Sequence, residues 1–289
     1  MEYLKAILLG ILQGLTEFLP VSSSGHLSVA QHFMNLGGPG ALMLTVFLHI
    51  GTLVAVIAVY YKTFWKLIKE IGFFFRDLFT GKLSRKNISE NRHLLYMMVW
   101  SCVPLLFLFV PIGGGRNLKD LADQWSGDND IILEGVCFMV TAILLFVGSY
   151  ASRHKKNIKP TVNGKQAWWV GVAHMLAALF PGLSRSGSTI STGMLLGVEK
   201  DYMVEYSFVL GTPAILAASI VEIKDAVGGA AMNMSIGPIL VGIITAGVFG
   251  VLAIKLLEWL VHKDKFQFFG YYCMILSIVV IALGIAEKV

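Results

Sequence analysis

Blocks of apolar residues alternate with shorter polar segments along the whole chain. A helix needs roughly 20 mostly apolar residues to cross the hydrocarbon core of a bilayer, which is about 30 Å thick. Several blocks approach that length and contain hardly any charge. The pattern predicts six membrane-spanning helices, at Ala41–Tyr61, Leu94–Ile112, Ile131–Tyr150, Tyr206–Val221, Ile236–Leu257 and Phe268–Ile285.

Two other apolar segments, Met1–Asn35 and Lys165–Gly197, are each interrupted by a polar run that contains proline, serine and glycine. The polar runs are Pro20–His26 and Pro181–Thr189. Broken helices at membrane depth are tolerated only where they are buried in protein or line a wet cavity. We therefore expect both segments to fold as re-entrant helical hairpins.

These two segments also resemble each other, and each is followed by three full spans. Aligning Pro20 with Pro181 places Gln13 opposite His174 and brings two Ser-Gly pairs to nearly the same position. An odd number of spans inserts the second half upside down relative to the first. The sequence thus predicts one all-α integral membrane domain over residues 1–289. Its inverted-topology repeats would cover residues 1–150 and 165–289.

Composition and charge agree with a membrane protein. The 289 residues are 56% apolar and 14% charged, whereas soluble domains carry about 25% charged residues. Lysine and arginine gather after Tyr61, Tyr150 and Leu260, and the positive-inside rule makes these segments cytoplasmic. Gly113–Asp130 and Glu222–Ser235 are poor in both residue types and should be external, as should both termini. Topology therefore accounts for the net charge of +5, and no nucleic-acid partner is implied.

The first polar run contains residues that are costly to place inside a membrane and are therefore functional candidates. Gln13 and Glu17 are four residues apart and share one helix face. The hydroxyls of Ser22–Ser24, at the start of a new helix with free backbone N–H groups, form a ready anion site. Ser23 and His26 are three residues apart, so we expect a nucleophile with an acid or base beside it.

The second polar run places Arg185 among Ser184, Ser186, Ser188 and Thr189. The planar fork of an arginine suits a phosphate group. If Arg185 meets the first run at the repeat interface, the cluster has the parts of a phosphoryl-transfer site. His174 either lines this site or is a core histidine. We assign the remaining ionisable residues in or near spans to helix ends or interhelical hydrogen bonds, namely His49, Glu134, Glu222 and Glu258.

The stretches Gln13–His26 and Pro181–Thr189 resemble the two signature motifs of the undecaprenyl-diphosphate phosphatases, and the resemblance extends over essentially the whole chain. It implies removal of the terminal phosphate from undecaprenyl diphosphate, or from other polyprenyl diphosphates, at the external face of the bacterial plasma membrane. The products would be inorganic phosphate and the monophosphate carrier lipid for peptidoglycan synthesis. The resemblance also implies a link to bacitracin resistance and a divalent cation, magnesium or calcium.

The resemblance implies a role for each matching residue. Ser23 would be the nucleophile or the hydroxyl that orients the attack, and Glu17 would act as base or bind metal. His26 would be an acid or base, and Arg185 would bind the phosphate. Many members have glutamate where this chain has Gln13, whose carbonyl oxygen can still bind metal. The substrate-binding set would be Gln13, Ser22, Ser24, Ser184, Ser186 and Thr189.

The main alternative is a membrane transporter, either a flippase for a carrier lipid or a carrier for a small anion. Inverted repeats with broken helices are typical of transporters, although transport gives little reason to place Ser23 beside His26. A non-catalytic scaffold would leave the buried ionisable residues unexplained. The formation of a covalent phosphoserine and the oligomeric state, a homodimer included, are left open by the sequence.

Overall fold

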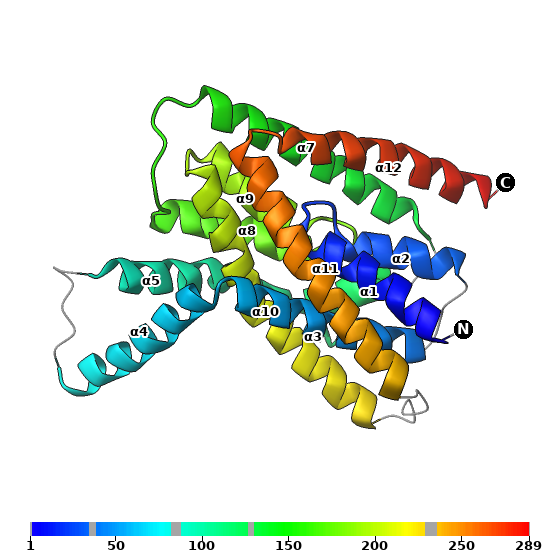
Figure 1. Ribbon diagram of the computed structural model, residues 1–289, viewed down its shortest axis with the longest axis horizontal. Coiled ribbons are helices and arrows are strands. Elements are labelled where there is room, and N and C mark those ends of the chain that lie inside the picture. Colours follow the sequence, from blue (N-terminus) through cyan, green and yellow to red (C-terminus); the bar gives the residue numbers. More distant parts are fainter. Residues whose placement is uncertain (1, 35–38, 82–87, 127–129, 229–235, 289) are drawn as a thin grey trace.

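The computed structural model describes residues 2–34, 39–81, 88–126, 130–228 and 236–288 (Figure 1). This part of the chain folds into α-helices joined by short connections, with one 3₁₀ helix and one two-stranded hairpin. Five of its helices are long and apolar enough to cross a membrane, and a bent helix pair raises the number to six. The prediction of an all-α integral membrane protein is confirmed.

Both expected hairpins are present as pairs of helices separated by a polar break. The first pair is α1 (Glu2–Phe18) and α2 (Ser23–Phe33), and the second is α8 (Gly164–Leu179) and α9 (Arg185–Leu195). Each break begins one residue before the proline that the sequence places there, because proline lacks the N–H that would continue the helix.

The long helices follow the predicted spans, with shifted ends. α5 (Glu90–Cys102) continues as the 3₁₀ helix η1 (Val103–Phe109), and α10 begins six residues before its predicted span, at Lys200 rather than Tyr206. α10 ends at Gly228, and the other long helices are α3 (Pro39–Val59), α7 (Ile132–His154), α11 (Ile236–His262) and α12 (Gln267–Ala286).

The segment after Tyr61, expected as a cytoplasmic loop, instead contains the helix α4 (Tyr61–Phe79), which is bent by 85° from α3. Its contact face carries Glu70 and Asp77, and Arg92 of α5 binds both carboxylates at 2.6 and 2.8 Å. An amphipathic helix therefore replaces the expected loop up to Phe79.

The expected external loop Gly113–Asp130 is also partly structured. It contains the end of β1 (Pro111–Gly113), which pairs antiparallel with β2 (Arg116–Asn117), and then α6 (Leu118–Ser126). Residues 82–87 of the first basic segment and 229–235 of the external loop expected at Glu222–Ser235 lie outside the described residues.

The two halves of the chain exchange packing partners (Figure 1). α1 packs on α11, from the second half, and α8 packs on α5, from the first half. Both contacts are close because Gly10 and Gly171 lack side chains: a Cβ there would lie 2.8 Å from Gly242 O and 2.3 Å from Ser101 O. Gly10 and Gly171 are equivalent when Pro20 is aligned with Pro181. This exchange supports the inverted repeat, which stays a prediction.

Candidate active site

The two polar breaks meet in the centre of the protein. The backbone N–H of Gly182, in the second break, donates to Ser24 Oγ at 3.3 Å. A Cβ at Gly187 would lie 3.2 Å from the carbonyl oxygen of Pro20. Segments 158 residues apart in the sequence are thus in direct contact, as the prediction of a shared site requires.

Each break leads into its second helix through the same serine cap. Ser22 Oγ accepts from Gly25 N at 3.3 Å, and Ser184 Oγ accepts from Gly187 N at 3.1 Å. In both breaks the cap hydroxyl also lies near that of the serine two residues later, at 3.3 Å in the first and 3.5 Å in the second. Two capped helix N-termini therefore border one region, and each end favours bound anions.

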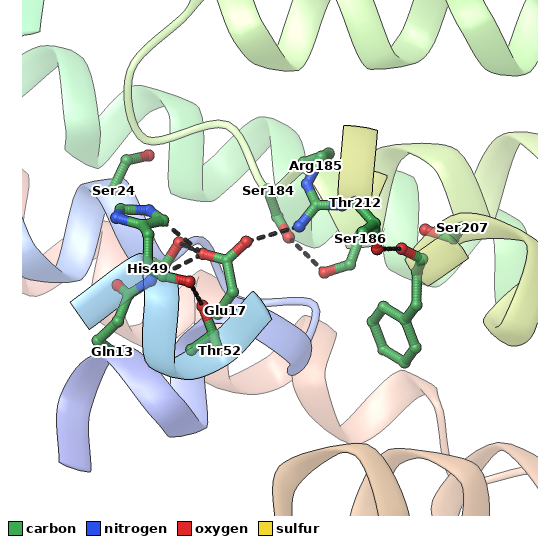
Figure 2. Close-up of polar contacts among 12 residues, drawn as sticks. Gln13, Glu17, Ser24, His49, Thr52, Ser184, Arg185, Ser186, Ser207 and Thr212 are labelled. Atoms are coloured by element: carbon green, nitrogen blue, oxygen red, sulfur yellow. Dashed lines mark hydrogen bonds and ion pairs between the residues drawn. The ribbon is translucent and has the colours of Figure 1, made fainter. Parts of the chain in front are cut away.

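Glu17 joins the two halves of the site (Figure 2). Its Oε1 accepts from Arg185 Nη2 at 2.6 Å, and its Oε2 accepts from Ser23 Oγ at 2.6 Å and from Gln13 Nε2 at 3.1 Å. The Glu17 residue is only 7% exposed. The structure thus brings Gln13, Glu17, Ser23 and Arg185 together, in the predicted cluster.

One site residue was missed from the sequence. His49 of α3 lies with Nε2 3.8 Å from Glu17 Oε2, and its Nδ1 is 2.9 Å from the carbonyl oxygen of Thr45 (Figure 2). From the sequence, His49 is expected at a helix end or in an interhelical hydrogen bond, whereas the structure places it beside Glu17. Its position in the middle of an apolar span was the available signal, since ionisable residues at such positions are functional candidates.

The expected pair between Ser23 and His26 is not formed, which corrects that prediction. His26 Nδ1 lies 2.7 Å from the carbonyl oxygen of Ser22, and Nε2 lies 2.8 Å from Tyr272 Oη on α12. Both ring nitrogens are therefore engaged away from Ser23, whose hydroxyl is bonded to Glu17. Ser22 has a φ of +73°, unusual for a residue other than glycine, so His26 stabilises a strained turn beside the site.

Thr189, expected to bind substrate, is engaged in hydrogen bonds within the protein. Its hydroxyl bonds to Ser207 Oγ of α10 at 2.6 Å and to the carbonyl oxygen of Arg185 at 2.9 Å. It therefore joins α9 to α10, and the residue is only 1% exposed. His174 is 2% exposed, and its Nδ1 has no hydrogen-bond partner among the described residues.

The site has a closed side and an open side. Phe18, next to Glu17, is 1% exposed and packs edge-on against Phe208 of α10, with ring centroids 5.3 Å apart. Ser24 is exposed, whereas Gln13 and Glu17 are buried. A ligand would therefore reach the cluster past Ser24, where the two helix N-termini lie. A carboxylate, a hydroxyl and a guanidinium in this arrangement can position and transfer a phosphoryl group.

Comparison with known proteins agrees with this chemistry. The family described as "Bacitracin resistance protein BacA" matches residues 6–279. An undecaprenyl-diphosphatase of Alkaliphilus metalliredigens is 36% identical, covering 99% of this chain and 100% of the relative. Proteins with the same name from Methanosphaera stadtmanae and Bacteroides fragilis are each 35% identical, over 99% and 98% of this chain and 99% of each relative. The chain belongs to the BacA family.

Proposed function

We propose that this protein is an undecaprenyl-diphosphate phosphatase that releases inorganic phosphate and leaves undecaprenyl phosphate. The observation that carries the proposal is the buried contact of Glu17 with both Ser23 and Arg185. Relatives named undecaprenyl-diphosphatase align with almost the whole chain. Their shared name favours hydrolysis over the transport alternative.

The residues divide the work of phosphoryl transfer. Ser23 donates its hydroxyl to Glu17 Oε2, so the carboxylate can accept a proton through this hydrogen bond. If the serine oxygen attacks the terminal phosphorus, its proton passes to Glu17, the bridging P–O bond breaks and undecaprenyl phosphate leaves; water then hydrolyses the phosphoserine to inorganic phosphate. If water attacks directly, Ser23 orients it, the proton of the water passes to Glu17, and the same P–O bond breaks. Arg185 and the N-termini of α2 and α9 neutralise charge on the phosphate oxygens. His26 acts by holding the turn at Ser22, which fixes where Ser23 begins its helix.

The site fits a divalent cation that is bound together with substrate. Gln13 Oε1 is buried and has no hydrogen-bond partner among the described residues. The Nε2 atom of the same side chain donates to Glu17. The described part of the chain has no cluster of three or more His, Cys, Asp or Glu side chains that could hold a metal. Magnesium commonly takes one or two protein ligands and completes its shell with phosphates and water. Gln13 and Glu17 would hold this ion, which would neutralise diphosphate charge.

We place the reaction at the external face of the bacterial plasma membrane. Lysine and arginine gather in the segments after Tyr61, Tyr150 and Leu260, which supports an orientation with these segments in the cytoplasm and the start of α7 outside. The second break lies near that end of α7, since a Cβ at Gly182 would be 2.9 Å from Cα of Glu134. The polyprenyl chain would lie along the apolar outer surfaces of the spans, while the diphosphate reaches the cluster past Ser24.

Phosphate release tests the proposal directly. Purified protein in detergent should liberate inorganic phosphate from a prenyl diphosphate. Ser23→Ala and Arg185→Ala should each abolish the release in protein that is still folded at the assay temperature. Thr80→Ala, at the exposed end of α4, is the control that should leave the rate unchanged. Undiminished turnover in both site variants would defeat the assignment.

A further inference from the structure

Arg185 needs support from outside its own helix. It is the first residue of α9, where the partial positive charge of a helix N-terminus disfavours a cation. Its guanidinium nevertheless lies 2.6 Å from Glu17, and its side chain is 17% exposed. Some neighbouring element must therefore fix the direction of this side chain.

That element is α10, at Gly211. A Cβ at this position would lie 1.3 Å from Arg185 Nη1, 2.4 Å from Cζ and 3.2 Å from Nη2. The guanidinium thus occupies the space that any other side chain at position 211 would fill.

The glycine is not explained by backbone conformation. Gly211 lies inside α10, away from the positive-φ glycines of the chain. Glycine in a helix interior is less favourable than alanine by about 1 kcal/mol. Glycine is therefore required at position 211 because it has no side chain, and not because of its conformational freedom.

The contact holds Arg185 by shape. Nη1 is buried and has no acceptor within the described part of the chain. Nη1 is therefore not oriented by a hydrogen bond to the described residues, whereas Nη2 donates to Glu17. Close packing on the α10 backbone remains as the constraint that aims Nη2 at the carboxylate.

The same stretch of α10 also contacts both helices that carry the ion pair. Phe208 packs edge-on against Phe18, the residue after Glu17, and Ser207 bonds to Thr189 of α9 at 2.6 Å. Gly211 lies one turn further along this stretch. α10 is therefore the common support on which the carboxylate and the guanidinium meet.

We propose that Gly211 is a positioning residue of the phosphatase, whose absent side chain provides the space for the Arg185 guanidinium. The inference rests on the proposed function. Gly211→Ala should force the guanidinium away from Glu17 and lower turnover by about 10²- to 10³-fold, the range for losing one preorganised charge-stabilising donor. Gly72→Ala is the matched control, because a Cβ at Gly72 meets nothing within 4 Å.

A double-mutant cycle separates this role from a general defect in folding. Thermal unfolding is measured for Gly211→Ala in the native protein and in Arg185→Ala, whose truncated side chain leaves the space empty. We expect Gly211→Ala to lower the unfolding temperature in the first background, and to leave it equal or raise it in the second. Wild-type turnover in Gly211→Ala, or equal destabilisation in both backgrounds, would overturn the inference. If the native protein itself released no phosphate, the proposed function would fail while the cycle still tested the contact.

Discussion

Replacing Glu17 with Gln removes one negative charge from the centre of the site and keeps the shape of the side chain. Glu17 is the acceptor for Arg185 and Ser23, each at 2.6 Å, and for Gln13 at 3.1 Å. The amide can replace part of this hydrogen bonding, but it cannot neutralise the guanidinium. The variant therefore separates charge from packing.

The structure sets the size of the effect. Removing one partner of a buried ion pair costs about 3–5 kcal/mol, because the other charge is left uncompensated. Arg185 is 17% exposed and keeps some access to water, so we expect a loss toward the lower end, about 3 kcal/mol. Turnover should fall further, by about 10²- to 10⁴-fold, because Ser23 loses the carboxylate that takes its proton.

The decisive assay compares the single variants Glu17→Gln and Arg185→Gln with the double variant Glu17→Gln/Arg185→Gln. The double variant buries no unpaired charge, so thermal unfolding in detergent should show most of the lost stability restored. Phosphate release should stay lost in both. A Glu17→Gln protein that unfolds at the wild-type temperature would refute the reasoning, as would a double variant as unstable as the sum of the two single changes.

Three further predictions follow from neighbouring contacts. His26→Asn should retain a higher initial rate of phosphate release than His26→Ala, because its amide can still donate to the strained turn; equal rates would argue against the positioning role. Gly25→Ala should lower the unfolding temperature, at a cost of about 1–3 kcal/mol for overpacking, since its Cβ would lie 2.7 Å from Phe138 Cζ. Gly164→Ala, whose Cβ meets nothing within 4 Å, is its control, and matching unfolding temperatures would contradict the packing argument. Chelation should stop phosphate release and magnesium should restore it, with a higher magnesium requirement in Gln13→Ala; an unchanged requirement would exclude Gln13 as a ligand.

Most of the fold could be predicted from the sequence because lipid imposes a simple rule on helix length and polarity. The lysines and arginines after Tyr61 indicate a cytoplasmic loop, but charge reports the side of the membrane and does not exclude the helix α4. Its contact-face residues Leu67, Glu70 and Asp77 nevertheless recur at helical spacing. This spacing, and not the charge, is the sequence signal for α4.

Site residues could be predicted from the sequence where an ionisable side chain is costly to place inside a membrane. Roles that depend on the direction of a side chain could not be predicted. Glu17 and Arg185 are too expensive inside a membrane to lack a function, and they do meet. The same reasoning would have found His49. The direction of His26 depends on Tyr272, 246 residues later, and no local spacing carries that information.

The contacts between the two halves also bear on the choice between hydrolysis and transport. A transporter built from inverted repeats works by rocking one repeat against the other around its site. Here such rocking would have to separate Glu17 from Arg185 and break the hydrogen bond from Gly182 to Ser24. Breaking this ion pair alone would leave two charged side chains in a buried site without a partner, which is unfavourable. A phosphatase gains from the same rigidity, because donors that are already in place stabilise the developing charge without reorganisation.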